Sequence, residues 1–113
     1  MQNNNKIIAV DFDGTIVTNK FPNIGEPIHE IIAHIKTLQK NGARLILWTC
    51  RRDEHLTAAV NFCKAHGIIL EAVNENLPDI INTFGGDTRK IYADLYIDDR
   101  AANLSEILNP TNI

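Results

Sequence analysis

The sequence lacks several features that would point to particular classes of protein. It has only two cysteines among 113 residues, and its formal net charge is −3. So few cysteines do not make a disulfide framework, which favours a reducing, cytoplasmic compartment. The charge, together with the lack of a basic tract, disfavours a broad nucleic-acid-binding surface. No apolar run approaches the length of a membrane span, and the run near the N-terminus is too short for a signal peptide.

What remains is the composition of an ordinary globular domain. Hydrophobic residues make up 44% of the chain and charged residues 22%, both typical values. The length predicts one domain, spanning residues 1–113, and a domain of this size buries about two-thirds of the surface of its unfolded chain. We therefore expect a single cytoplasmic domain with a substantial core and no membrane partner.

Short apolar runs alternate with stretches of helical periodicity. The run that begins KIIAV is apolar throughout, as in a strand buried on both faces. The patterns predict strands at 6–11, 44–49, 68–73 and 93–98, and helices that begin at Pro27 and Asp53 and cover 77–84 and 103–108. Proline is favoured in a first helical turn, and aspartate as a cap. The alternation predicts a Rossmann-like α/β fold of three layers, with a parallel sheet of about four strands covered by helices on both faces.

Polar residues gather where the predicted strands end. The first strand ends in Asp11 and Asp13, the second in Thr49, and the last in Asp98 and Asp99. Residues two apart on a strand share a face, so the first two carboxylates can point into one pocket. Ligands of such sheets bind beyond the carboxyl ends of the strands. We therefore expect these side chains to surround a ligand.

The residue types indicate which ligand this is. Clustered carboxylates repel one another, and a hard cation removes the repulsion. Mg²⁺ favours oxygen ligands and often holds a substrate phosphate as well. Gly14 would let the backbone approach that phosphate closely. The side chains expected to line the phosphate site are Thr49 and one or more of Arg51, Arg52, Arg89 and Lys90.

The two aspartates of the first strand can divide the chemistry between them. Asp11, as a carboxylate, can attack phosphorus and form an aspartyl-phosphate. Asp13 can give a proton to the leaving alkoxide if its surroundings raise its pKa above the ordinary value of about 3.9, and otherwise that proton comes from water. As a base, Asp13 can then activate the water that hydrolyses the aspartyl-phosphate. This pattern of residues favours phosphate-ester hydrolysis.

Four motifs, taken in order, resemble those of the haloacid dehalogenase superfamily. They are DFDGT at 11–15, the strand-end threonine in LILWTCR, the lysine in TRKIYADLYIDD, and the acidic pair at 98–99. They span most of the chain. The resemblance implies a Rossmann-like fold and Mg²⁺-dependent phosphotransfer through an aspartyl-phosphate. It favours a phosphatase, because the name-giving dehalogenases typically lack an acid at the position of Asp13.

The resemblance also implies a role for each residue of the first three motifs. Asp11 would be the nucleophile and a metal ligand. Asp13 would be the general acid and base, and would lend its backbone carbonyl to the metal. Thr49 and Lys90 would hold the phosphoryl group, with Arg89 or Lys64 as alternative cations.

The last motif would complete the metal site. Its sequence is IDDRAAN rather than the commoner glycine–aspartate form. Asp99 is the expected direct ligand of the metal. Asp98 would either bind the metal directly or contact one of the groups that do, and Asn103 would also contact a group that binds the metal.

The resemblance implies an open site, because the loop at 16–26 and the segment after the third strand are too short for a cap domain. Such a site takes a small phosphorylated substrate or the phosphorylated end of a macromolecule, or is covered by a second subunit of a homo-oligomer. We expect Arg51, Arg52 and Asn74 at its rim. Cys50 is not expected to be a nucleophile, because a phosphatase cysteine loop needs an arginine six positions on, where this chain has Leu56. Its backbone N–H is expected to meet the phosphate.

The sequence thus predicts a Mg²⁺-dependent phosphatase that acts on a sugar phosphate, a nucleotide or a polynucleotide end. One alternative is a receiver-like phosphoacceptor domain of signalling. That fold would carry its phosphoacceptor aspartate at the end of the third strand, where this chain has EAVNEN. The other is a degenerate, non-catalytic member of the superfamily that acts as a binding module, against which the intact acidic set argues.

Overall fold

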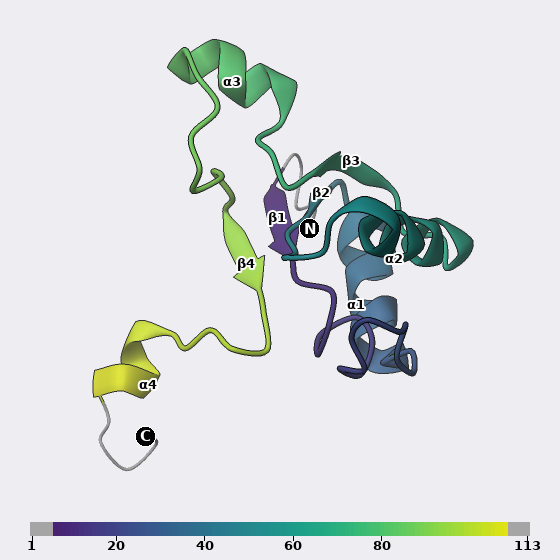
Figure 1. Cartoon of the computed structure of the whole chain (residues 1–113). Coiled ribbons are helices and arrows are strands. Elements are labelled where there is room, and N and C mark those ends of the chain that lie inside the picture. The colour runs from purple at the N-terminus through teal and green to yellow at the C-terminus, as the bar shows by residue number, and fades with distance from the viewer. Residues whose placement is uncertain (1–5, 109–113) are drawn as a thin grey trace.

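The computed structural model describes residues 6–108, in which four strands alternate with four helices (Figure 1). In chain order these are β1 Ile7–Val10, α1 His29–Lys40, β2 Arg44–Leu47, α2 Asp53–Ala65, β3 Leu70–Val73, α3 Pro78–Phe84, β4 Leu95–Ile97 and α4 Leu104–Leu108. Every predicted element is present, and each strand is shorter than predicted. None of the helices in this part of the chain is long and apolar enough to cross a membrane.

The four strands form one parallel sheet in the order β3-β2-β1-β4. Val10, the last residue of β1, lies beside Leu47 of β2 and Ile97 of β4, so the carboxyl ends of these strands meet at one edge of the sheet. The chain runs outward from β1 through β2 to β3 and then crosses back to place β4 on the other side of β1. The strand order therefore reverses between β1 and β4, which is where ligands of such sheets bind.

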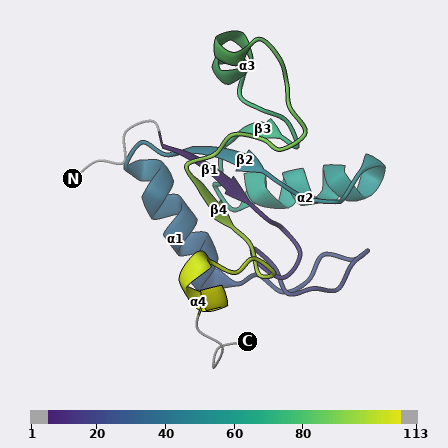
Figure 2. The same ribbon diagram turned by 90° about the vertical axis from the view of Figure 1, so that its left-hand side faces the viewer.

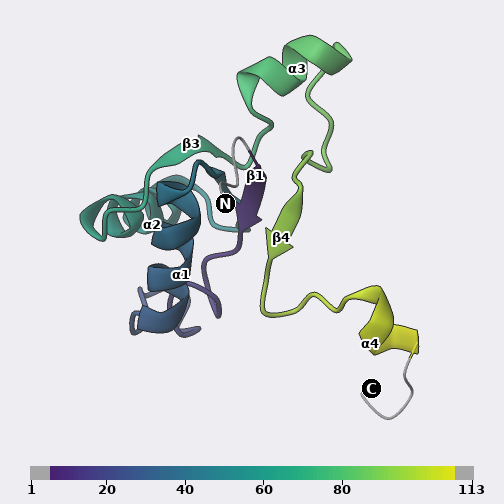
Figure 3. The same ribbon diagram turned by 180° about the vertical axis from the view of Figure 1, so that it is seen from behind.

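Helices α1 and α2 lie on the same side of the sheet, and Figures 1 and 3 show them together from opposite directions. Their apolar stripes pack on the alternate residues of β1 and β2 that face them, because successive side chains of a strand point to opposite faces. The buried residues of this main core include Ile8, Val10, Leu45, Leu47, Ile32, Ile35, Ala59 and Cys63. Helices α1 and α2 thus form the helical layer that was predicted for this face of the sheet.

The opposite face of the sheet carries a smaller core. It is built from Ile7, Ala9, Ile46, Ala72, Leu77 and Ile91. Helix α3 adds the partly buried Ile80, and none of its own residues is buried. In Figures 2 and 3, α3 stands away from the strands. The sheet is thus of the predicted α/β type, with one thick helical layer and one thin one.

One expected helix start and one expected helix cap are wrong. Pro27 does not open a helix, because it pairs with Val17 in an isolated β-bridge, and α1 begins two residues later at His29. Asp53 does not cap α2. It is the first helical residue, at φ 55°, after the N-cap residue Arg52, and no side-chain hydrogen bond caps this helix.

Candidate functional site

The site begins where β1 runs into a tight turn. The backbone N–H of Asp11 still donates to Ile97 O at 2.9 Å, so the ladder between β1 and β4 continues one residue past Val10. Phe12 then buries its ring completely, and its carbonyl accepts hydrogen bonds from the N–H groups of residues 15, 16 and 17. With Phe12 anchored, its neighbours Asp11 and Asp13 both line the cavity beyond the strand ends, as the alternation of side chains predicts.

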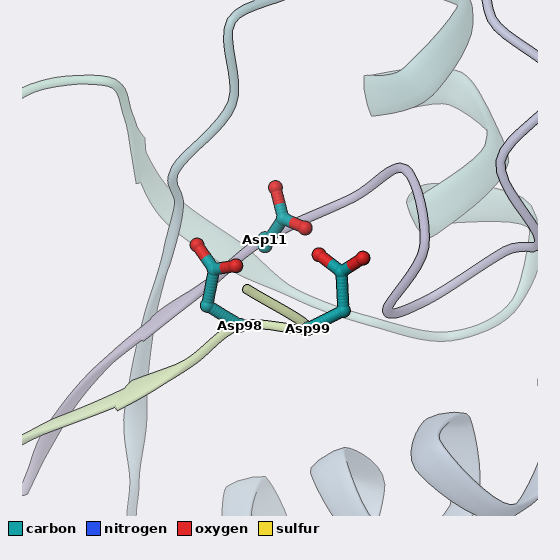
Figure 4. Close-up of side chains that lie close together, drawn as sticks. All are labelled: Asp11, Asp98 and Asp99. Atoms are coloured by element: carbon teal, nitrogen blue, oxygen red, sulfur yellow. The ribbon is translucent and has the colours of Figure 1, made fainter. Parts of the chain in front are cut away.

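Three carboxylates converge at the reversal point between β1 and β4. Asp11 follows β1, and Asp98 and Asp99 follow β4 (Figure 4). One carboxylate oxygen of each lies within 4.8 Å of the others. These are three of the four predicted metal ligands. Asp13, the fourth, does not join the group with its side chain and instead pairs with an arginine.

The electrostatics of this cluster suit a cation. The pKa of Asp11 is raised from 3.8 to about 6, with burial as the largest cause and the negative charge of Asp98 as the second, while a hydrogen bond from Thr15 opposes the shift. Partial burial and like charge both disfavour an ionised carboxylate, and a bound divalent cation would remove both penalties. The donor set, all carboxylate oxygen, is the kind that Mg²⁺ prefers.

Thr15 is a site residue that the sequence reasoning did not single out. The residue is 5% exposed. Its hydroxyl donates to Asp11 Oδ2 at 3.1 Å and accepts a hydrogen bond from the backbone N–H of Asp99, also at 3.1 Å. One hydroxyl thus ties the end of β1 to the end of β4. Its place in DFDGT was the available signal.

Gly14 is required by the same junction. It has φ +89°, and a Cβ built there would lie 2.4 Å from Asp99 Oδ2. A side chain at this position would therefore both strain the backbone and displace a predicted metal ligand. The sequence predicted that the backbone at Gly14 approaches a phosphate closely. Within the protein, the group that lies closest to the missing Cβ is the Asp99 carboxylate.

Asp13 is held by Arg51. Its two carboxylate oxygens accept hydrogen bonds from Arg51 Nε and Nη2, each at 2.8 Å. The arginine side chain is 1% exposed and that of the aspartate 16%. Arg51 was expected at the rim of the site, and the structure instead buries it behind Asp13, although it still lines the cavity.

The end of β2 contributes the residues expected to meet the phosphate. The backbone N–H of Thr49 donates to Asn74 Oδ1 at 2.8 Å, and Thr49 Oγ1 accepts from the N–H of Arg51 at 3.2 Å. Asn74 lies at φ 56° directly after β3. Cys50 is a free, exposed thiol. Thr49, Cys50 and Asn74 line a side cavity of about 270 Å³ that also touches Asp11 and Asp98.

The main cavity at the strand ends has a volume of about 420 Å³. Besides the residues already described, three that the sequence reasoning missed line it: Asn19, Phe21 and Arg100. Phe21 is 55% exposed and packs its ring edge-on against His55, with ring centroids 5.6 Å apart. The cavity is thus acidic at its base and has an aromatic ring at its mouth.

Several predicted residues are not brought to this cavity. Lys90 lines a different cavity, and its Nζ lies 6.0 Å from the centre of the Tyr96 ring. Arg52 is 90% exposed and lies beyond the residues that line the site. Asn103 caps α4, where its Oδ1 accepts from the N–H of Glu106 at 3.0 Å. The alternative cations Arg89 and Lys64 are exposed and line neither cavity at Asp11.

Comparison with known proteins gives one informative likeness. No family model and no curated protein matches the sequence. A solved structure of a conserved protein coded by a locus from Bacteroides thetaiotaomicron is similar, with a TM-score of 0.77 and 44% identical residues over 90% of this chain and 80% of that one. The likeness supports the fold and assigns no activity.

Proposed function

We propose that this chain, which belongs to the same family as the conserved Bacteroides thetaiotaomicron protein, is a Mg²⁺-dependent phosphatase that works through an aspartyl-phosphate. The observation that carries the proposal is the convergence of Asp11, Asp98 and Asp99 at the point where strand order reverses, with their oxygens within 4.8 Å of one another. The resemblance to the haloacid dehalogenase superfamily supports it through the motifs of Asp11, Thr49 and the acidic pair 98–99, which line the cavity, whereas the lysine of the remaining motif does not. The second acid, Asp13, in the same cavity also supports the proposal.

In the first step Asp11 acts as the nucleophile. One of its carboxylate oxygens forms a bond to the phosphorus of a phosphomonoester, and the bond between phosphorus and the ester oxygen breaks. Asp13, on the wall of the same cavity, takes up a proton from solvent as the substrate binds and gives it to the departing oxygen, which leaves as an alcohol. Mg²⁺, when held by Asp11, Asp98 and Asp99, supplies the positive charge that lets a carboxylate and a phosphate dianion approach each other.

In the second step Asp13 acts as a base. It takes a proton from a water molecule as that water bonds to phosphorus, and the bond between phosphorus and Asp11 breaks. Inorganic phosphate leaves, and both aspartates return to their starting forms. Thr15 keeps the Asp11 carboxylate in place throughout, because its hydroxyl donates to Oδ2 at 3.1 Å.

The remaining wall of the cavity suits the substrate. At the end of β2, the donors that we assign to the phosphate oxygens are the hydroxyl of Thr49 and the backbone N–H of Cys50, because the Thr49 N–H already donates to Asn74. Arg100 is the cation that we propose for the phosphate, because it lines the cavity whereas Lys90 lines another. The volume of about 420 Å³ leaves room beside the phosphate for an organic group against Phe21.

The test is hydrolysis of an aryl phosphate by the purified protein, with Mg²⁺ and with a chelator, beside Asp11→Asn. We expect turnover that needs Mg²⁺ and is lost in the variant. Asp79→Asn is the matched control, because Asp79 pairs with Arg44, which lies at the amino end of β2. This variant should keep full activity.

Two other results would contradict the proposal in different ways. Labelling of Asp11 by a small phosphodonor that persists for minutes, without turnover, would favour the phosphoacceptor domain. Mg²⁺ binding with neither turnover nor labelling across sugar phosphates, nucleotides and polynucleotide ends would favour a non-catalytic binding module.

A further inference from the structure

Arg51 has an unusual set of contacts for an arginine beside a phosphate site. Its Nε and one N–H of Nη2 donate to Asp13, each at 2.8 Å. The other N–H of Nη2 donates to Asn23 O at 3.0 Å, and Nη1 donates to Pro22 O and to His55 O, each at 3.2 Å. Its guanidinium carbon also lies 5.1 Å from the ring centre of Phe21.

These contacts use every donor that an arginine has. A guanidinium carries five N–H groups, and the five hydrogen bonds above account for all of them. The side chain is 1% exposed, so little of it is accessible to a ligand. An arginine that binds a phosphate needs donors directed at it. Arg51 is therefore committed to the protein and is not a substrate-binding group.

We propose that Arg51 is a positioning residue, which fixes the carboxylate of Asp13 and joins it to the loop that carries Phe21. The inference rests on the proposed phosphatase function. A bidentate arginine–carboxylate pair sets the direction and plane of the carboxylate, which a single hydrogen bond would not do. The carbonyls of Pro22 and Asn23 fix the other side of the same guanidinium, so the loop and Asp13 share one anchor.

This anchor matters because it binds the exposed tip of the loop to the same guanidinium that holds Asp13. Between Thr18 and Glu26 the loop is closed at its base by a hydrogen bond from the N–H of Thr18 to Glu26 O at 2.8 Å. Its tip residues Phe21, Pro22 and Asn23 are exposed. Without Arg51, Asp13 and the tip of the loop would both lose the hydrogen bonds that fix their positions relative to each other. A misplacement of about 1 Å in a reacting group costs up to about 100-fold in rate.

The experiment is a double-mutant cycle on kcat with an aryl phosphate, using Arg51→Gln, Asp13→Asn and the double variant. We expect Arg51→Gln to lower kcat about 10- to 100-fold while KM changes less than about threefold. In the Asp13→Asn background the same change should lower kcat less than about threefold, because its effect passes through Asp13. Equal effects in both backgrounds, or a rise in KM alone, would overturn the proposal.

A second readout separates positioning from a general structural role. Asp13 acts in both steps, but an aryloxide leaves with little help from an acid, whereas the second step still needs Asp13 as its base. Arg51→Gln should therefore accumulate aspartyl-phosphate and release a burst of phenol close to one per protein molecule. Arg44→Gln is the control, because Arg44 also makes a bidentate pair, with both Asp79 oxygens at 3.0 Å, yet lies at the opposite end of β2. It should show no burst and an unchanged kcat.

The fold of each variant is checked by thermal unfolding, because removing one partner of a buried pair leaves a charge unpaired. If Arg51→Gln does not fold, Arg51→Lys replaces it. A lysine keeps the charge but not the planar fork, so kcat should still fall about tenfold, and full activity in Arg51→Lys would overturn the proposal. Wild-type protein without Mg²⁺-dependent turnover would instead remove the phosphatase function itself, and the inference with it.

Discussion

Replacing the proposed nucleophile should make the metal-free protein more stable. In Asp11→Asn the side chain keeps an oxygen that can accept the hydrogen bond from Thr15 Oγ1, now 3.1 Å from Asp11 Oδ2. It loses the charge that burial and Asp98 both disfavour. The group that we assign to the chemistry is thus also a source of instability in the absence of Mg²⁺.

The size of this effect follows from the pKa of Asp11, which is raised from 3.8 to about 6. The folded state therefore holds its proton more tightly than the unfolded state. The carboxyl costs nothing below its unfolded pKa, and the cost grows as the pH rises toward the folded pKa. A difference of about two units between the folded and unfolded pKa values corresponds to about 3 kcal/mol of unfolding free energy. Because Asp11 is only partly buried, solvent screening reduces the expected cost to about 1–2 kcal/mol.

The assay is urea unfolding with a chelator present. At about pH 8, Asp11→Asn should be more stable than the wild type by about 1–2 kcal/mol, and at about pH 5 the gain should be about half as large. Adding Mg²⁺ should stabilise the wild type and not the variant. Asp79→Asn is a control of opposite sign, because Arg44 lowers the pKa of that carboxyl. A gain that does not change between the two pH values would refute the electrostatic reasoning.

Three further changes test the neighbourhood of the acidic cluster. Gly14→Ala should cost about 1–2 kcal/mol in urea unfolding and weaken Mg²⁺ binding in calorimetry, because its Cβ would lie 2.4 Å from Asp99 Oδ2 at φ +89°. Thr15→Val should lower kcat about tenfold, because a hydroxyl bonded to a carboxylate is lost at nearly constant volume; an unchanged kcat would contradict that role. Arg100→Ala should raise KM for an aryl phosphate about tenfold, whereas Lys90→Ala should leave it within about twofold, because only the first lines the cavity. The reverse order would restore the sequence-based assignment of Lys90.

The fold and the acidic site residues could be predicted from the sequence because both depend on short local patterns. An apolar run such as that before Asp11 predicts a buried strand, and parallel strands place their ends together whatever lies between them. The role of Arg51 was not predictable in this way. Its partners at 13, 22 and 23 are distant in sequence, and nothing in the residue type separates an arginine that binds substrate from one whose donors the protein itself uses.

The position of Lys90 could not be predicted from the sequence for a similar reason. The resemblance of the third motif suggested that Lys90 holds the phosphate. The segment before β4 is instead held by Asn76, which is 2% exposed and whose amide nitrogen donates to Asp87 Oδ1 at 2.7 Å. Asn76 Oδ1 also accepts from the N–H of Tyr92 at 2.7 Å. This network decides which way residues 87–92 run, and it depends on contacts that sequence spacing does not reveal.

The balance of charge in the cavity makes one last prediction, that metal and phosphate bind together. Four aspartates and two arginines line the cavity, and Arg51 is neutralised by Asp13. The remaining three carboxylates face a single free cation, Arg100, so a phosphate anion meets net repulsion until Mg²⁺ is present. Calorimetry with inorganic phosphate should therefore detect binding only with Mg²⁺. By linkage, phosphate should tighten Mg²⁺ binding by the same factor. Equal phosphate affinity with and without the metal would show that these carboxylates do not govern the site.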